Sequence, residues 1–423
     1  MPSSAGRTTI TTMSIPALSL LLGPDAAGLL DAAVGEYGAS LTSVQVADAH
    51  VAPTGGVRVR YCGQVRRADG SLRAEVLVAA TGDRITSGAA VLAGEFDGAA
   101  VQVGVWRWQQ DPALPGLATA SHPVRLAQLL AGGGIRVAGP LRISVRAYRP
   151  GQRAVLEVSD SCSRWFVKVV PPVAVAGLQR RHALLSAVLP VPPIVAADAD
   201  GLIVLAEAPG TLLRHLVSRD APYGTALPNP KALQQLLDRL PSSLSQLPAR
   251  VSHLQRVEQS VRVLQLTAGA SALLEQVADE LRSAPRQQHL EVPVHGDFHD
   301  GQLLFDGGRI SSVIDIDTAG RGERADEWAA LLGHLSVYGL SSPRARSYGA
   351  EVLAFASRQV DADDLRLRTA AVVLGLATGP FRTQRPDWRD RTSMRLALAH
   401  QWLLEMRINS SAAPAALMST RDC

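Results

Sequence analysis

The sequence has 423 residues, of which 47% are hydrophobic and 19% are charged, and its net charge at pH 7 is +4. A chain of this length predicts two or three domains, and this composition excludes intrinsic disorder over most of it. Three cysteines without a CxxC pair exclude a disulfide framework, so we expect a reducing compartment. Nucleic acid is not expected as a partner, because no Lys/Arg-rich run with interleaved aromatic residues occurs.

The N-terminal residues predict neither a signal peptide nor a membrane span. Residues 1–12 are small and polar, which is typical of a disordered tail. The apolar stretch Ile15–Leu22 follows a single basic residue, Arg7, and Pro24 comes where a cleavage site would lie. A membrane helix needs about 20 apolar residues, whereas the longest stretch in the second half, Thr369–Phe381, has 13. We therefore expect a cytoplasmic protein without a membrane partner.

Residues 13–135 predict a separate α+β module. A helix is expected over Pro16–Gly35, and another after Gly116 through Leu129. Alternating apolar and polar residues predict three strands, the first two joined as a hairpin: Val57–Tyr61, Leu72–Ala79 and Val101–Trp108. Trp106 and Trp108 share one strand face and are interpreted as core or interface residues. The module carries no cluster of nucleophilic or ligating residues, so we expect a cap without a catalytic role of its own.

The glycine-rich segment Ala131–Gly134 predicts a boundary. Four strands are expected after it: Ile143–Tyr148, Ala154–Val158, Trp165–Val170 and Ile203–Ala206. A helix over Ala176–Ala187 lies between the last two. From Leu212 onward the pattern is mostly helical, apart from a β-rich segment over Val292–Asp317.

The β-rich segment carries the most informative motif, His295-Gly-Asp-Phe-His-Asp-Gly-Gln302, followed by a hairpin that ends at Asp315. The spacing predicts that Asp297 and Asp315 lie on adjacent loops of that hairpin. Phosphoryl transfer requires a carboxylate to orient the attacking hydroxyl, and a carboxylate with an amide to hold magnesium. Lys168, one of two lysines in the chain, lies in a predicted strand where its ammonium could reach phosphates.

With these residues the chain resembles the aminoglycoside phosphotransferase and choline kinase superfamily, whose catalytic loop reads roughly HGDxHxxN. The resemblance covers about residues 143–405. It implies an α+β, protein-kinase-like bilobal fold, with a small antiparallel β lobe and hinge over 136–210 and a large helical lobe over 211–410. A small α+β cap would precede the lobes and a loose tail would follow over 411–423. The N-terminal module also resembles that of maltokinase-like enzymes.

The resemblance implies catalytic roles for three residues of the loop. Asp297 is similar to the catalytic base, and His295 would brace the loop. His299 would lie near the phosphates or the substrate. Glu327 matches an acidic position that anchors the following helix.

The resemblance also implies binding sites for ATP and Mg²⁺. Lys168 is similar to the phosphate-binding lysine, and the segment that ends in Ala206 and Glu207 is similar to the hinge that meets adenine. Three residues would hold the metal: Asp315, Gln302 and Asp317. The expected activity is ATP- and Mg-dependent phosphorylation of a hydroxyl on a small molecule, which would be a sugar, an amino-sugar or aminoglycoside, or a similar alcohol.

Two departures from the superfamily pattern leave an alternative open. Gln302 stands where the superfamily has asparagine, and its amide reaches about 1.5 Å further, one C–C bond. No acidic residue lies between Lys168 and Asp198, so Lys168 lacks its usual helix glutamate and would pair with Asp315 or with phosphates alone. The alternative is a pseudokinase or nucleotide-binding regulator. The sequence predicts neither the acceptor nor the oligomeric state.

Overall fold

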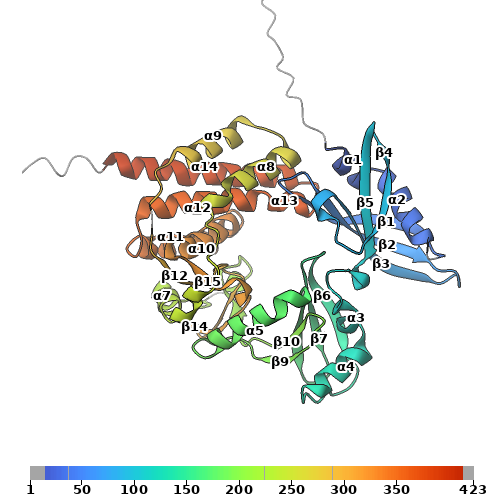
Figure 1. Cartoon of the computed structure of the whole chain (residues 1–423). Coiled ribbons are helices and arrows are strands. Elements are labelled where there is room, and N and C mark those ends of the chain that lie inside the picture. Colours follow the sequence, from blue (N-terminus) through green and yellow to red (C-terminus); the bar gives the residue numbers. More distant parts are fainter. Residues whose placement is uncertain (1–14, 37, 223, 288, 413–423) are drawn as a thin grey trace, which may run out of the picture.

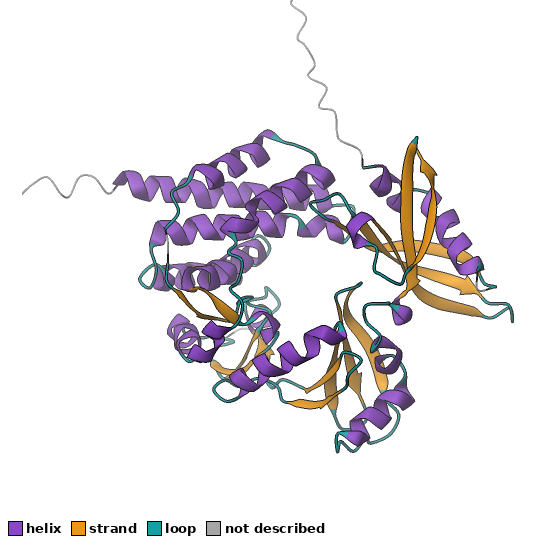
Figure 2. Ribbon diagram, viewed as in Figure 1, coloured by secondary structure: helices purple, strands orange, loops and turns teal. Residues whose placement is uncertain are grey.

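The computed structural model describes residues 15–412, apart from 37, 223 and 288. The predicted tail over residues 1–12 lies outside the described residues, as do residues 413–423 of the predicted C-terminal tail. Figures 1 and 2 show three bodies around the middle of the molecule: an N-terminal sheet with two helices, a second sheet with helices on it, and a large helical body.

The N-terminal body is an antiparallel five-stranded sheet in the order β1-β2-β3-β5-β4. Its strands are β1 (Ser40–Val51), β2 (Val57–Arg66), β3 (Leu72–Thr81), β4 (Ala90–Phe96) and β5 (Ala99–Arg107). The three predicted strands are confirmed, whereas β1 and β4 were not predicted because neither alternates strictly. The predicted first helix is two helices, α1 (Pro16–Leu22) and α2 (Asp25–Gly35), since Pro24 interrupts the hydrogen-bond ladder.

Among the described residues no single helix is long and apolar enough to cross a membrane. Only α1 and α2 taken together reach that length and composition, and a bend of 74° separates them. Their buried side chains pack on the N-terminal sheet.

The second body is also antiparallel, with the strand order β6-β7-β8-β10-β9. Its strands are β6 (Arg142–Arg149), β7 (Arg153–Ser159), β8 (Arg164–Val169), β9 (Ile194–Ala197) and β10 (Leu202–Ala206). The four predicted strands and the helix α5 (Pro172–Ser186) are confirmed. The helix predicted after Gly116 is two helices, α3 (Leu117–Ala120) and α4 (Pro123–Gly132), which pack on this sheet although they precede the predicted boundary.

The third body is the large helical lobe. Its helices are α6 (Leu213–Leu216), α7 (Pro230–Asp238), α8 (Val257–Ala268), α9 (Ala272–Ser283), α10 (Arg324–Gly339), α11 (Pro343–Ala356), α12 (Ala362–Ala377), α13 (Gly379–Arg382) and α14 (Trp388–Ala412). Its short strands form two sheets. One has the order β11 (Thr211–Leu212), β13 (Leu303–Asp306) and β14 (Arg309–Val313), and the other pairs β12 (Glu291–Val294) with β15 (Gly320–Glu323). The predicted α+β fold with a small antiparallel lobe and a large helical lobe is confirmed.

The N-terminal body contacts both lobes. Trp106 Nε1 donates a hydrogen bond to the Tyr148 hydroxyl on β6 at 3.2 Å, and the Trp108 ring packs edge-on against the same tyrosine. On the other side, Leu266 of α8 and Phe381 of α13 join the apolar core of the N-terminal sheet. The two tryptophans are therefore interface residues, and the body bridges the lobes instead of covering one of them.

Candidate active site

The loop between β12 and β13 is held by a buried carboxylate. Glu327 on α10 is 2% exposed and accepts backbone N–H groups from His295 at 2.7 Å and Gly296 at 2.9 Å. Burial raises the pKa of Glu327 to about 7, against the lowering effect of those two hydrogen bonds. Gly296 has φ +80°, and a Cβ there would lie 2.5 Å from the Thr318 carbonyl oxygen, so the loop requires glycine.

His295 is the first residue of this loop, and it is 3% exposed. Its Nε2 donates to the Ile314 carbonyl at 3.1 Å, while its Nδ1 accepts the Asp297 backbone N–H at 3.3 Å. Burial lowers the pKa of His295, which agrees with a neutral ring that donates at one nitrogen and accepts at the other. The side chain thus connects the loop between β12 and β13 to the end of β14.

The structure brings the two predicted aspartates together through the predicted amide. Gln302 Nε2 lies 3.2 Å from Asp297 Oδ2 and 3.4 Å from Asp315 Oδ2 and donates toward both. Asp297 keeps 43% of its side chain exposed, so a ligand can reach its carboxylate. Asp315 has φ +55°, the left-handed conformation that turns the chain directly after β14.

Lys168 projects from β8 onto these carboxylates. Its Nζ lies 3.1 Å from Asp315 Oδ1 and 2.7 Å from both carboxylate oxygens of Asp317. Helix α5 carries no acidic partner for Lys168, and the loop after β14 supplies that partner instead. Arg153 on β7 adds a bidentate contact to Asp315 at 3.1 and 3.3 Å. Burial acts to raise the pKa of Asp315, but Lys168 and Arg153 hold it below its usual range.

The two residues predicted as the hinge lie apart from this charged group. Ala206 is the last residue of β10, and the Glu207 carboxylate forms an ion pair with Arg164 at 3.1 Å. An apolar cleft opens beside Lys168, and Ile203 and Leu205 of β10 line it, whereas Ala206 and Glu207 do not.

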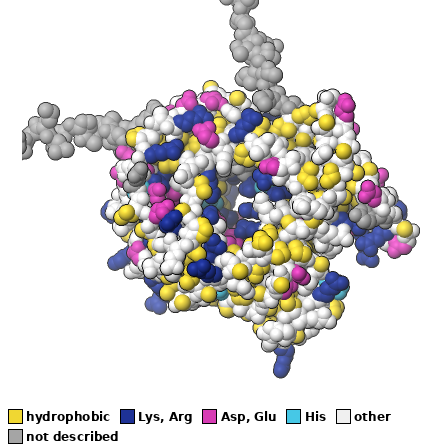
Figure 3. Space-filling view, viewed as in Figure 1, with side chains coloured by type: hydrophobic (Ala, Val, Ile, Leu, Met, Phe, Trp, Pro, Cys, Tyr) yellow, Lys and Arg dark blue, Asp and Glu magenta, His cyan; other side chains and the backbone are white. Residues whose placement is uncertain are grey.

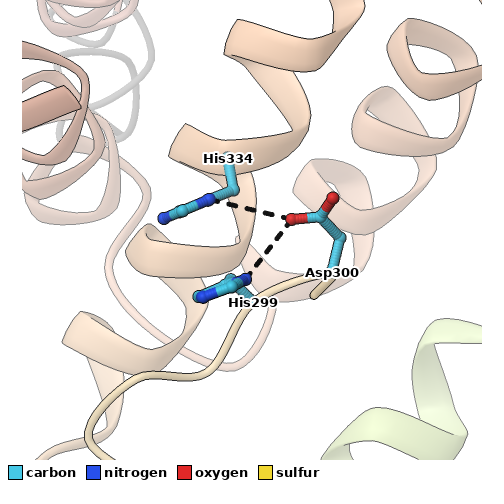
Figure 4. A group of neighbouring side chains, drawn as sticks. All are labelled: His299, Asp300 and His334. Atoms are coloured by element: carbon cyan, nitrogen blue, oxygen red, sulfur yellow. Dashed lines mark ion pairs between the residues drawn. The ribbon is translucent and has the colours of Figure 1, made fainter. Parts of the chain in front are cut away.

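His299 lies in a group of side chains with Asp300 and His334 (Figure 4). The sequence predicted a role for His299 but not for the other two. The His299 ring stacks on that of His334 with 4.0 Å between centroids, and the Nδ1 atoms lie 3.5 and 3.8 Å from Asp300 Oδ1. Asp300 is fully buried and forms an ion pair with Arg214 at 2.8 Å. His334 and Arg214 come from α10 and α6, and no local pattern marked them.

The charge on His299 follows from its two carboxylate neighbours. Burial acts to lower its pKa, but contacts with Asp297 and Asp300 outweigh that effect and raise the pKa to about 9. The contact with His299 in turn holds the pKa of Asp297 well below its usual range, against the raising effect of burial. His334 stays neutral because burial and the charge of His299 lower its pKa to about 3.

The donor set near Asp315 fits a hard cation better than the histidine group does. Magnesium prefers oxygen ligands in octahedral geometry, and Asp297, Asp315 and Gln302 offer carboxylate and amide oxygens. Gln302 would have to turn its amide so that the oxygen faces Asp315. The group of His299, Asp300 and His334 offers three atoms within 4.8 Å of one another, but its only carboxylate, Asp300, already forms an ion pair with Arg214 at 2.8 Å.

A family model described as the phosphotransferase enzyme family matches residues 144–362. That segment contains Arg153 and Lys168 of the second sheet, the loop over residues 295–302 and α10. No curated protein matches the chain at a significant level.

Several solved structures are similar to part of the chain. The macrolide 2′-phosphotransferase of Brachybacterium faecium shares 18% identity over 64% of this chain and 97% of its own, with a TM-score of 0.41. An aminoglycoside phosphotransferase in complex with ADP and hygromycin B shares 14% identity over 66% and 97%, with a TM-score of 0.42. The choline kinase of Cryptosporidium parvum shares 11% identity over 65% and 92%, with a TM-score of 0.43.

Proposed function

Because the chain belongs to the phosphotransferase enzyme family, we propose that it transfers a phosphoryl group from Mg-ATP to a hydroxyl group of a small molecule. A sugar, an amino-sugar or a similar alcohol is the acceptor class that this resemblance implies, and the cytoplasm is the compartment. The observation that carries the proposal is the Gln302 amide between Asp297 and Asp315, with Lys168 on the far side of Asp315.

Asp297 would orient the acceptor hydroxyl and accept its proton. Its carboxylate is exposed enough to be reached, and the charge of His299 keeps it ionised. In phosphoryl transfer the carboxylate mainly positions the nucleophile, since the transition state is loose. His295 and Glu327 would act only through the loop that they hold.

Lys168 and Arg153 would hold the phosphates. Asp315 and Gln302 would hold magnesium, which would neutralise the charge of the phosphates. Asp317 was predicted as a third ligand, but both of its oxygens lie 2.7 Å from Lys168. We therefore infer that Asp317 positions the lysine, as the helix glutamate does in other members. The backbone of Ala206 and Glu207 would meet the adenine, which remains a prediction from the resemblance.

The first test measures thermal unfolding of the full chain with AMP-PNP, with and without magnesium. Ligand at a hundred times its Kd stabilises the folded state by about 2.7 kcal/mol, so we expect a clear rise in Tm that requires magnesium. ADP release with a panel of polyols and sugars then identifies the acceptor. Absence of any shift with Mg-AMP-PNP would refute the proposal.

The alternative function, a pseudokinase or regulator, rested on Gln302 and on the missing helix glutamate. Both departures have a structural counterpart here, because Gln302 spans the two aspartates and Asp317 meets Lys168. Magnesium-independent stabilisation by AMP-PNP would favour the regulator.

Replacing Gln302 with asparagine separates these functions further. The shorter side chain withdraws the amide by about 1.5 Å, and a misplacement of about 1 Å can cost a hundredfold in rate. We therefore expect Gln302→Asn to lower kcat by about a hundredfold, while the exposed control Gln401→Asn changes nothing. A gain in kcat would instead mean that the native amide is misplaced for catalysis.

A further inference from the structure

A group of arginines that the proposed mechanism does not use surrounds the middle of the molecule. Figure 3 shows a hollow there, with dark-blue side chains in it and around its rim. Four arginines from three separate parts of the chain converge on His50 of β1: Arg58, Arg84, Arg149 and Arg382.

Backbone and side-chain contacts place the first of these arginines at the tip of the β6–β7 hairpin. Arg58 lies directly opposite His50 in the β1–β2 register. Its Nη1 donates to the Pro150 carbonyl oxygen at 2.6 Å. Pro150 follows Arg149 in the chain, so the guanidinium of Arg58 and the residue Arg149 meet at this tip.

The other two arginines reach the same place from opposite sides. A Cβ on Gly151 of the hairpin tip would lie 2.8 Å from Thr86 Oγ1, two residues after Arg84. Phe381 of α13 packs in the same apolar core as the residues that flank His50 in β1, and Arg382 follows it directly. The N-terminal sheet, the hairpin and the helical lobe therefore each present a guanidinium to one region.

These charges lack partners within the described part of the chain. None of the four guanidiniums forms an ion pair with a described residue, and Arg58, which is only 6% exposed, has an Nε without a hydrogen-bond acceptor. Two carboxylates lie near the group, but Asp48 already accepts from Arg60 at 2.6 Å, and the buried Asp111 accepts from the Tyr148 hydroxyl at 2.8 Å and from the Gly151 N–H at 2.7 Å. Burial and the surrounding arginines lower the pKa of His50 to about 3, so the ring is neutral and does not balance the charge of the arginines. Guanidiniums of like charge gathered in one region repel one another, and an anion bound between them removes that repulsion.

We propose that these four arginines bind an anionic group of the acceptor, such as a phosphate monoester, and so make the acceptor a negatively charged alcohol. This inference rests on the proposed function. Arg149 links the group to the active site, because it lies opposite Arg153 in the β6–β7 register and Arg153 contacts Asp315 at 3.1 Å. An acceptor that reaches from the arginine group to the active site would place its anionic group among the arginines and its hydroxyl toward Asp297.

The same charges exclude a polycation. Like charges facing one another across an interface are strongly unfavourable. An aminoglycoside, which the sequence left open as an acceptor, would bring several ammonium groups to this region. We therefore expect anionic sugars to be favoured over amino-sugars.

The test titrates inorganic phosphate by calorimetry into the full chain saturated with Mg-AMP-PNP, so that the nucleotide site is filled. We expect phosphate to bind, and Arg382→Ala to weaken its binding about tenfold or more, as loss of a charge-assisted hydrogen bond does. Arg382 is exposed, so the variant should fold, and Arg125→Ala on the exposed face of α4 is the control. Phosphate that binds only without AMP-PNP, or equally to both variants, overturns the inference.

Turnover separates this inference from the proposed function. We expect ADP release to be faster with hexose monophosphates than with neutral hexoses or amino-sugars. The variant Arg382→Ala should raise the KM for the phosphate ester by a larger factor than it lowers kcat. Turnover of neutral sugars alone would refute the anionic acceptor and leave the phosphotransferase intact. Arg382-dependent phosphate binding without any ADP release would refute the phosphotransferase and leave the anion site.

Discussion

Replacing Asp297 with asparagine is expected to lower kcat by about a hundredfold to ten-thousandfold, the range that a positioned general base contributes. Asparagine keeps the size of the side chain and one oxygen that can accept from Gln302. Its amide cannot accept a proton from the acceptor hydroxyl. Because the side chain is 43% exposed, we expect the variant to fold and to keep its AMP-PNP affinity.

A second measurement on Asp297→Asn requires no acceptor. Asp297 helps to raise the pKa of His299 to about 9, so the variant should move that pKa toward 6.5, as followed by proton NMR. The raised pKa means that His299 contributes stability fully below pH 6.5, and that this contribution is lost as the pH rises through about 9. The variant should therefore flatten the fall in stability between pH 6.5 and 9.

The control for both measurements is Asp306→Asn, at the exposed end of β13. Turnover that survives Asp297→Asn at the level of this control would remove Asp297 from the catalytic role. An unchanged His299 pKa would show that the two side chains are not coupled.

Replacing Lys168 with methionine is expected to destabilise the protein and to abolish nucleotide binding. Removing one partner of a buried ion pair costs about 3–5 kcal/mol. Asp315 and Asp317 keep 18% of their side chains exposed and Arg153 remains beside them, so we expect a loss near the lower end, about 3 kcal/mol. Urea unfolding measures the stability, and calorimetry with Mg-AMP-PNP measures binding. Lys231→Met, at the other and exposed lysine, is the control.

The double variant Lys168→Met/Asp317→Asn tests what Asp317 does. If Asp317 positions the lysine, neutralising it should restore much of the stability lost in Lys168→Met, but no nucleotide binding. If Asp317 is instead a magnesium ligand, as the sequence predicted, Asp317→Asn alone should weaken the magnesium dependence of AMP-PNP binding and leave stability unchanged.

Local patterns in the sequence predicted individual strands and the proximity of the two aspartates, whereas the two-lobed α+β fold was implied by the family resemblance. Strict alternation marks strands such as β2 and β5, and the short β13–β14 hairpin places the ends of its flanking loops side by side. Strands β1 and β4 escaped prediction because they become strands by pairing with neighbours, not by alternation. The roles inferred for the site residues remain predictions.

Only the tertiary structure decided which charges meet. The ammonium of Lys168 pairs with a carboxylate 149 residues away, and Arg58 binds a carbonyl 92 residues away. The stacking of His334 on His299 depends in the same way on how α10 packs beneath the catalytic loop. An ion pair forms wherever packing brings opposite charges within reach in a region of low dielectric constant. The contact of Lys168 with Asp315 was one of the two alternatives that the sequence left open. Residue spacing carries no record of the other approaches, so the contact of Lys168 with Asp317 and the arginine group could be found only in the folded molecule.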